Sequence, residues 1–308
     1  MSGKMRVGVI GVGHLGRHHA RILSNLEDVQ LVAVADIKRD RAEQVGGPLG
    51  ARATGDYHDL IGQVDAVTIA VPTDAHGDVA LPFLKRGTPV LIEKPLARTL
   101  AEADRMIAAA RASGATLAVG HTERHNPAVR AASTVITRPR FIEVHRLGTF
   151  PERSLDIDVV FDLMIHDLDV VLSLVHSEVE AIEAVGVPVL TDRVDIANAR
   201  LRFADGCIAN ITASRISRER VRKIRFFQPD AYVSIDYAEQ EVEVYRLVLG
   251  DGPRPDIQGG PIAVERQEPL RCEMIDFIAS ARTGAEPAVN GEQGRRALVV
   301  ATRIVEKM

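Results

Sequence analysis

Two short clusters in the sequence carry residue types that could move a proton and stabilise negative charge. The first is Glu93-Lys94-Pro95-Leu96, directly after an apolar run, and the second is a helical segment with Asp162 and His166. Hydride transfer from a secondary alcohol needs an acid/base for the hydroxyl proton and a positive group for the alkoxide. His166 suits the first task because an unperturbed imidazole titrates near neutrality. Lys94 suits the second, and Asp162 could orient and tune both.

The position of Lys94 favours chemistry, although a plain structural explanation exists. Lys94 follows a predicted strand over 89–92, and the carboxyl ends of parallel strands face the ligand crevice. We expect Pro95 to fix the turn after this strand, with a cis Lys94-Pro95 bond as one way to aim the lysine. The structural alternative is a solvated lysine at a strand end.

The helical segment has a similar pair of explanations. Asp162 and His166 are four residues apart, which puts them on one helix face. The structural alternative is a solvated helix face with an i,i+4 pair. A metal site that adds His121 or His125 is disfavoured, because no third ligand has a fixed spacing to the pair. We therefore expect no metal.

The clusters need a cofactor beside them, and residues 5–36 have the pattern of a dinucleotide site. An apolar run leads into Gly11-x-Gly13-x-x-Gly16, and a helical pattern and a second apolar run follow. Gly11 suits a tight turn, Gly13 lets backbone approach a pyrophosphate, and Gly16 lets the helix pack close to the strand. The helix N-terminus would face the phosphates. His14 and Leu15 lie within this turn and are expected cofactor contacts.

The second apolar run ends on Asp36, which bears on the choice of cofactor. A carboxylate at this point can accept hydrogen bonds from both ribose hydroxyls of an unphosphorylated adenosine. Lys38 and Arg39 could instead attract a 2'-phosphate, but Asp36 would repel it directly. We therefore expect NAD rather than NADP. The structural alternative for Asp36 is a cap at the strand end.

The elements that position these residues fall into two patterns. Up to about Gly120, apolar strands alternate with helices, which predicts a doubly wound parallel sheet of the α/β class. After that point, alternating runs follow one another without helices between them, which predicts an α+β domain with a large, mainly antiparallel open sheet. We expect a dinucleotide-binding domain over 1–121 and a substrate-binding and oligomerisation domain over 122–308. The segment from Gly250 to Gly260 is expected to be a surface loop.

Composition excludes several classes of protein. The chain has 308 residues, a formal net charge of −4 and no apolar run near the roughly 20 residues of a membrane span. These features argue against nucleic-acid and membrane partners. Cys207 and Cys272 are isolated, which argues against a disulfide or zinc knuckle. We expect a cytoplasmic protein whose open sheet face is covered by a second copy, as a homodimer or homotetramer.

Three motifs taken in order resemble the glucose-fructose oxidoreductase / inositol dehydrogenase (Gfo/Idh/MocA) family. They are the glycine turn, Glu93-Lys94-Pro95 and the Asp162-x-x-x-His166 helix, and the resemblance covers essentially the whole chain. It implies an N-terminal Rossmann domain, a C-terminal open sheet used in oligomers, and oxidation or reduction of a sugar or polyol hydroxyl. By this resemblance Lys94 and His166 are the catalytic lysine and histidine, and Asp162 is the aspartate one turn earlier. The resemblance also places Pro72, Thr73 and His76 near the cofactor, and Glu93 and Lys94 are further expected cofactor contacts.

A finer resemblance points to the branch that includes UDP-N-acetylglucosamine 3-dehydrogenases. It rests on the segment 120–127, the Asp162-Leu-Met-Ile-His166-Asp167 form of the helix and Ser214-Arg215-Ile216-Ser217. His125 stands where this branch often has Phe, and with Asn126 it is an expected substrate contact. The alternatives are a dehydrogenase of a free sugar or inositol, and a non-catalytic NAD-binding sensor.

Arginines offer candidate contacts for the diphosphate of a sugar nucleotide. Arg215 opens a stretch to Arg225 with six basic residues and one acid, and Arg153 lies in the loop before the histidine helix. Arginine binds phosphate through two parallel hydrogen bonds, which suits such a contact. The structural alternative is equally open, because Val221, Ile224 and Phe226 interleave with the charges as in a strand with one solvated face.

Overall fold

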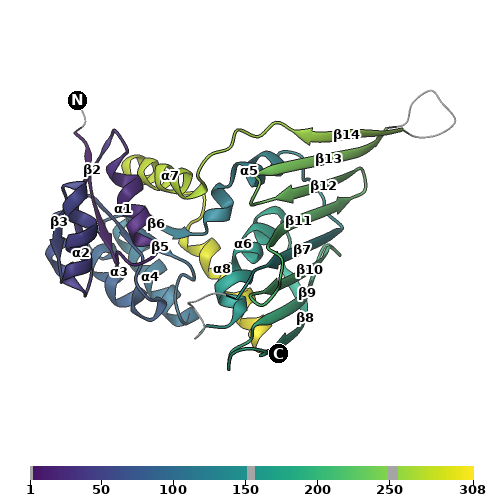
Figure 1. Cartoon of the computed structure of the whole chain (residues 1–308), viewed down its shortest axis with the longest axis horizontal. Helices are drawn as coiled ribbons and strands as arrows, with labels where there is room; N and C mark the ends of the chain where they lie inside the picture. The colour runs from purple at the N-terminus through teal and green to yellow at the C-terminus, as the bar shows by residue number, and fades with distance from the viewer. Residues whose placement is uncertain (1–2, 151–156, 249–255) are drawn as a thin grey trace. The chain divides into compact units, whose positions relative to one another are not determined.

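The computed structural model describes residues 3–150, 157–248 and 256–308. The chain divides into two compact units (Figure 1). The first contains Met1–His121 and Leu270–Arg295, and the second contains Thr122–Pro269 and Arg296–Met308. Leu270–Arg295, which lies within the range 122–308 expected for the second domain, belongs to the first unit.

The first unit is built on a six-stranded parallel sheet. Its strand order is β3-β2-β1-β4-β5-β6, with strands β1 (Met5–Ile10), β2 (Val29–Ala35), β3 (Arg52–Thr54), β4 (Ala66–Ile69), β5 (Val90–Glu93) and β6 (Leu117–Gly120). This confirms the predicted doubly wound parallel sheet. The order reverses between β1 and β4, and the crevice outside the carboxyl ends of these strands is where such sheets bind ligands.

The helices of this unit are α1 (Gly16–Ser24), α2 (Arg39–Gly46), α3 (His76–Leu84), α4 (Leu100–Ser113) and α7 (Pro269–Thr283). Thr99 caps α4, since its hydroxyl accepts a hydrogen bond from the Glu102 N–H at 3.2 Å, and Gly114 ends the helix in a left-handed conformation. Met274, Phe277 and Ile278 of α7 join the core formed by β1, β2 and α1. This packing explains why α7 belongs to the first unit. Across the described residues, no helix is long and apolar enough to span a membrane.

The second unit contains an eight-stranded sheet with the order β14-β13-β12-β11-β7-β10-β9-β8. Its strands are β7 (Phe141–Leu147), β8 (Val179–Val187), β9 (Ile196–Phe203), β10 (Ile208–Ser214), β11 (Val221–Gln228), β12 (Ala231–Asp236), β13 (Glu241–Val248) and β14 (Asp256–Ile262). Only the pairing of β7 with β10 is parallel among these strands. This confirms a mainly antiparallel sheet.

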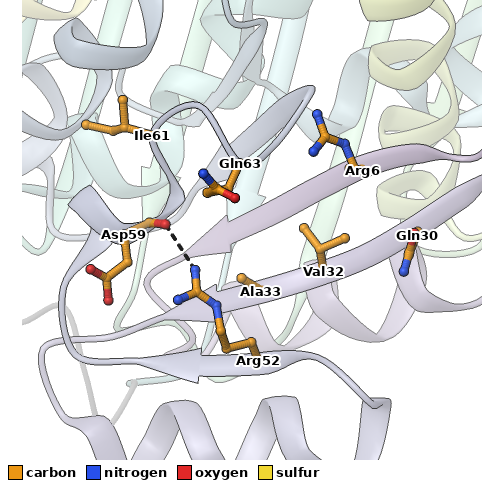
Figure 2. Close-up of a pocket in the computed structure, with 8 residues that line it drawn as sticks. All are labelled: Arg6, Gln30, Val32, Ala33, Arg52, Asp59, Ile61 and Gln63. Atoms are coloured by element: carbon orange, nitrogen blue, oxygen red, sulfur yellow. Dashed lines mark hydrogen bonds between the residues drawn. The ribbon is translucent and has the colours of Figure 1, made fainter.

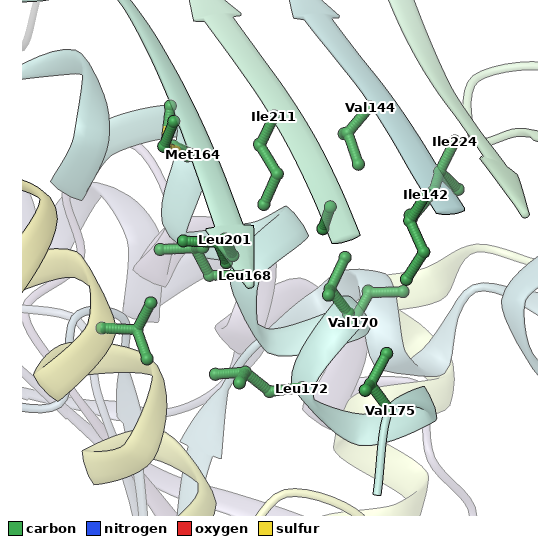
Figure 3. Close-up of a cluster of buried hydrophobic side chains, with 14 of the residues drawn as sticks. Ile142, Val144, Met164, Leu168, Val170, Leu172, Val175, Leu201, Ile211 and Ile224 are labelled. Atoms are coloured by element: carbon green, nitrogen blue, oxygen red, sulfur yellow. The ribbon is translucent and has the colours of Figure 1, made fainter. Parts of the chain in front are cut away.

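One face of this sheet is covered by helices. They are α5 (Pro127–Ser133), α6 (Ile165–Leu174) and part of α8 (Gly291–Val305). Figure 3 shows side chains of α6, among them Leu168 and Leu172, beside Ile142, Val144 and Ile211 of the strands. The strands alternate buried and more exposed residues, as the period of two requires. Helix α6 therefore packs against a continuous apolar face of the sheet.

Two segments differ from the sequence-based prediction. The loop expected over 250–260 is wrong from residue 256 onward, because β14 pairs there with β13 as an edge strand. Gly259 and Gly260 adopt φ values of 147° and 148°, which only glycine accepts readily, and an edge strand tolerates Pro261. The helical segment expected to contain Asp162 and His166 includes a π-helical turn over Val160–Met164 before α6. Such wide turns are frequent at functional sites.

Candidate active site

The glycine turn after β1 has the geometry expected for a phosphate cradle. Gly11 has a φ of 81°, and a Cβ on it would lie 2.7 Å from the Ala70 carbonyl oxygen. A Cβ on Gly16 would lie 1.8 Å from the Gly11 carbonyl oxygen, so only glycine allows α1 to start so close to the strand. Around Gly13 the nearest atom to a Cβ is a guanidinium nitrogen of Arg41, at 3.7 Å. The turn is therefore tightly packed at both ends and open in the middle, where a pyrophosphate would approach.

Asp36 lies at the carboxyl end of β2, and its carboxylate is held by three donors. Oδ2 accepts from the Val12 N–H at 3.1 Å and Oδ1 from the Lys38 N–H at 2.9 Å. The Arg41 guanidinium lies 3.3 Å from Oδ2. The carboxylate is thus fixed beside the glycine turn and next to a cation that sequence reasoning did not select.

The loop after β4 contains Pro72 and Thr73, and His76 begins α3 behind it. Pro72 is exposed, whereas His76 is buried. The imidazole Nδ1 lies 3.1 Å from the Pro95 carbonyl oxygen and Nε2 lies 3.1 Å from the Val71 carbonyl oxygen. Burial lowers the pKa of His76, while the carbonyl contacts and Glu93 act in the opposite direction. His76 therefore joins the loops after β4 and β5, and its expected cofactor contact stays a prediction.

Lys94 directly follows β5, which ends on Glu93. Lys94 is half-buried, the Lys94-Pro95 bond is cis, and Glu93 is buried with its Oε1 3.0 Å from Nε2 of His19. Lys94 thus lies at the carboxyl edge of the sheet, where ligands bind.

Asp162 and His166 belong to the helical segment that starts the second unit's long helix. Asp162 lies in the π-helical turn and His166 in the first turn of α6. Both are half-buried, whereas Met164, Ile165, Asp167 and Leu168 are buried. The two ionisable side chains are therefore more accessible than the core residues next to them on the helix.

An ion-pair network contacts this helix through Asp167. It was not predicted from the sequence. Arg146 of β7 is buried, and its Nε donates to Asp167 Oδ2 at 2.5 Å. Its terminal nitrogens also contact Glu123 Oε1 at 3.1 and 3.2 Å, and its guanidinium lies 5.2 Å from the centre of the Tyr237 ring. Burial alone would lower the pKa of Arg146, but the Asp167 and Glu123 carboxylates hold it above its ordinary value. The network fixes the helix directly beside His166.

A second buried carboxyl, that of Asp169, lies two residues after Asp167 on α6. Asp169 is 2% exposed, and burial raises its pKa to about 7 despite the Arg124 guanidinium 3.4 Å away. Glu123 and Arg124 both come from segment 120–127, one of the motifs of the finer family resemblance. The interactions described here give that motif a role in holding α6.

His125 and Asn126, the expected substrate contacts of this motif, are both buried. The Asn126 amide caps α5 by accepting from the Ala128 N–H at 3.0 Å, and it donates to the Tyr237 carbonyl oxygen at 3.0 Å. Their substrate-binding role stays a prediction, and for Asn126 the geometry favours a structural one.

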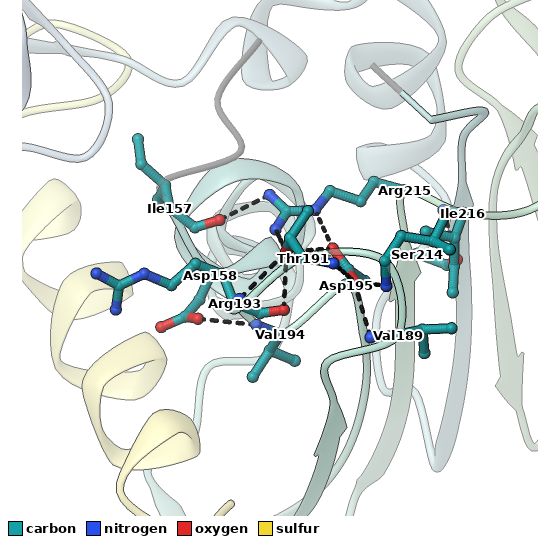
Figure 4. A network of polar contacts seen from close by, with 11 residues as sticks. Ile157, Asp158, Val189, Thr191, Arg193, Val194, Asp195, Ser214, Arg215 and Ile216 are labelled. Carbon is teal, nitrogen blue, oxygen red and sulfur yellow. Dashed lines mark hydrogen bonds and ion pairs between the residues drawn. The ribbon is translucent and has the colours of Figure 1, made fainter. Parts of the chain in front are cut away.

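Arg215 lies in a second buried network (Figure 4). Its Nε donates to Asp195 Oδ1 at 2.8 Å, and its terminal nitrogens donate to the Ile157 carbonyl oxygen at 2.7 Å and to the Thr191 hydroxyl at 3.0 Å. The expected contact with a substrate diphosphate stays a prediction, and this geometry favours a role in fixing the chain just before the histidine helix. Arg153, the comparable candidate, lies outside the described residues.

The Arg215 network gives the second unit an acid-sensitive element. Burial by itself would raise the pKa of Asp195, but the N–H groups of Leu190, Val189 and Thr191 and the Arg215 guanidinium hold it well below its usual range. The stabilisation from this depressed pKa is complete above about pH 4 and is lost as the pH falls through it. We expect Asp195→Asn to lower the free energy of unfolding at pH 7 by about 2 kcal/mol and to flatten its dependence on pH below 4.

Urea unfolding measured from pH 3 to pH 7 checks this prediction. Asp230→Asn, in the exposed turn between β11 and β12, is the matched control. Equal acid sensitivity of the Asp195→Asn variant and the unmodified protein would contradict the assignment.

A surface hollow in the first unit lies away from these residues. Figure 2 shows its lining, which includes Arg6, Gln30 and Arg52, and the hydrogen bond of Arg52 to the Asp59 carbonyl oxygen at 3.0 Å. Arg6 and Gln30 lie near the amino ends of β1 and β2, whereas the glycine turn follows the carboxyl end of β1. The hollow is therefore separate from the candidate cofactor site.

Comparison with known proteins matches both parts of the chain to one family. Residues 5–121 match the profile described as "Oxidoreductase family, NAD-binding Rossmann fold" (GFO_IDH_MocA), and residues 128–233 match the "GFO/IDH/MocA C-terminal domain". A UDP-N-acetylglucosamine 3-dehydrogenase of Acidithiobacillus ferrooxidans is 38% identical over 97% of this chain and 96% of that protein. A myo-inositol 2-dehydrogenase of Thermotoga maritima is 29% identical over 96% and 94%.

Solved structures show the same similarity. A structure of the Acidithiobacillus ferrooxidans 3-dehydrogenase superimposes with a TM-score of 0.92 at 37% identity, covering 100% of this chain and 98% of that one. A levoglucosan dehydrogenase in complex with NADH and levoglucosan has a TM-score of 0.88 at 20% identity, covering 99% and 97%, which supports the fold alone.

Proposed function

The chain belongs to the GFO/IDH/MocA family of NAD-binding oxidoreductases, and on this basis we propose that it transfers hydride between nicotinamide and a secondary hydroxyl of a sugar. One observation carries the proposal above all. Asp162 and His166 are half-buried, whereas the other ionisable groups of this helical segment, Asp167 and Asp169, are buried. A protein that only binds NAD has no need of an acid/base pair held in this way.

Each catalytic step is assigned to one residue of the chain. In the oxidative direction His166 accepts the hydroxyl proton as general base, and Asp162 orients and tunes the imidazole. Lys94 stabilises the developing alkoxide. NAD, when bound, accepts the hydride, and the glycine turn and Asp36 would hold its pyrophosphate and adenosine ribose.

The substrate we propose is a UDP-linked N-acetylamino sugar, oxidised at C3. Support comes from the 38% identity to a UDP-N-acetylglucosamine 3-dehydrogenase over nearly the full length of both chains. The runner-up is a free sugar or inositol, which the inositol dehydrogenase relatives support at lower identity. A non-catalytic NAD-binding sensor is the alternative from another class.

Absorbance of reduced nicotinamide tests the proposal directly. Protein and NAD are offered UDP-N-acetylglucosamine, N-acetylglucosamine, glucose and myo-inositol, with 2-oxoglutarate in parallel to recycle bound cofactor. We expect kcat/KM for the UDP-sugar to exceed that for the free sugar by at least about 100-fold, because a site built for a diphosphate is left with unpaired groups without it. Turnover of free polyols alone would identify a free sugar or inositol as the substrate in place of the UDP-sugar. If no sugar reduces NAD, the non-catalytic NAD-binding sensor is favoured.

We also propose NAD over NADP as the cofactor, on the basis of the buried Asp36 carboxylate. Asp36→Ser should lower the preference for NAD by at least about tenfold, because it removes the charge that repels a 2'-phosphate and releases Arg41 to bind one. The ratio of kcat/KM for the two cofactors is the measurement, with Asp40→Ser, an exposed acid of α2, as the control. An unchanged ratio would contradict the role of Asp36.

A homodimer or homotetramer is proposed from the helix-free face of the second sheet. Aromatic rings cross this face from β7 to β13, with Phe141, Phe227, Tyr232 and Tyr245 in successive contact at centroid distances of 5.2–6.2 Å. Their chain neighbours Ile142, Phe226, Val233 and Val244 are buried against the helices. A row of partly exposed rings of this kind is suited to burial by a second copy of the chain.

A further inference from the structure

A buried polar cluster lies inside the first unit, directly before Lys94. It contains His19 of α1, Glu93 at the end of β5 and Glu273 of α7, with exposed fractions of 0%, 6% and 1%. One ligand-type atom from each side chain lies within 4.8 Å of the other two. Three ionisable groups are thus brought together from segments far apart in the sequence.

The side chains of this cluster are close enough for their charges to affect one another. Two ionised carboxylates at this separation in a buried site repel each other strongly, so the cluster needs a proton or a cation. Nε2 of His19 lies 3.0 Å from Glu93 Oε1, whereas Nδ1 has no hydrogen-bond partner among the described residues. An imidazolium would bury a second N–H without an acceptor, and a metal-bound histidine normally donates this N–H to a neighbour. A neutral His19 that donates its Nε2–H to Glu93 leaves no buried N–H of this ring without an acceptor.

The Glu93 carboxylate is also fixed sterically. A Cβ on Gly120, its partner on β6, would lie 3.1 Å from Glu93 Oε2, so the absence of a side chain there makes room for the carboxylate. On the other side of Lys94, His76 contacts the carbonyl oxygens of Pro95 and Leu96 at 3.1 and 3.2 Å. The chain is therefore held immediately before and immediately after Lys94.

We infer that His19 and Glu273 are positioning residues which, through the buried Glu93 carboxylate, set the position and environment of the Lys94 amine. A well-packed apolar replacement for such a buried polar cluster is often no less stable, so stability alone gives little reason for it. Its position beside Lys94 gives a functional reason. The inference rests on the proposed function for what Lys94 does, but not for where Lys94 is held.

The test compares a donor-keeping and an apolar replacement at the same position. In His19→Gln the side-chain amide can still donate to Glu93, whereas His19→Leu has similar bulk and no donor. We expect His19→Leu to lower kcat at least about tenfold with the KM for NAD within about threefold, and His19→Gln to recover most of the loss. Glu273→Gln against Glu273→Met repeats the comparison if a His19 variant fails to fold, with the same expected pattern.

A second readout needs no turnover. The lysines are reductively methylated with a ¹³C label, and the Lys94 resonance is identified by its absence in Lys94→Arg. We expect the chemical shift of this resonance at neutral pH to differ from that of the unmodified protein in His19→Leu and to match it in His19→Gln. Equal behaviour of the Gln and Leu variants in both readouts, or one stoichiometric metal ion in the purified protein that is lost in His19→Leu, would overturn the inference. If Lys94→Ala turns over normally, the proposed function fails, and the resonance still decides the inference.

Discussion

Lys94→Ala is expected to lower kcat by about 10²–10³-fold while the affinity for NAD changes by less than about threefold. The amine follows β5 at the carboxyl edge of the parallel sheet, and a positive group there stabilises charge that develops on the substrate oxygen only during the reaction. Its removal should therefore raise the barrier without weakening the contacts to the pyrophosphate and ribose. Steady-state turnover and calorimetric titration with NAD measure the two quantities separately.

Two further variants show whether the charge or its position matters. Lys85→Ala removes an exposed lysine after α3 and should leave both quantities unchanged. Lys94→Arg keeps the charge but not the shape of the amine, so it should retain only part of the activity. Normal turnover of Lys94→Ala would end the assignment of Lys94 as the group that stabilises the alkoxide.

Local patterns in the sequence predict the scaffold well. The glycine turn is recognisable because a side chain at these positions would clash with residues nearby in the sequence. Gly16, for example, lies too close to the Gly11 carbonyl oxygen for a Cβ. The strands of the first sheet are apolar because both faces of a parallel sheet are covered. The capping signal of α4 and the alternation of β9 and β10 lie within the elements themselves, so such elements can be recognised from local sequence.

The polar networks could not be predicted in the same way. Arg146 and Asp167 are 21 residues apart, and Glu93 and His19 are 74 apart, so no local period connects them. In the sequence a buried arginine such as Arg215 is indistinguishable from a solvated one in a basic stretch. One signal was available, because acids and bases within an otherwise apolar helix, such as Asp167 and Asp169, need partners when that helix is buried. The partners themselves follow only from the tertiary fold.

Replacing His166 by asparagine is expected to lower kcat in the oxidative direction by about 10²–10⁴-fold, the usual contribution of a general base. The pH profile provides the sharper criterion. If His166 accepts the hydroxyl proton, kcat of the unmodified enzyme rises with pH as the imidazole loses its proton, and this rise disappears in His166→Asn. His176→Asn, an exposed histidine of the same unit, serves as the control and should keep both rate and profile. Asp162→Asn should keep the rise but displace its midpoint, because Asp162 acts on the imidazole and not on the substrate. A His166→Asn variant with an intact pH profile would show that another group takes the proton, and the buried Asp169, whose pKa burial raises to about 7, would be the next residue to test.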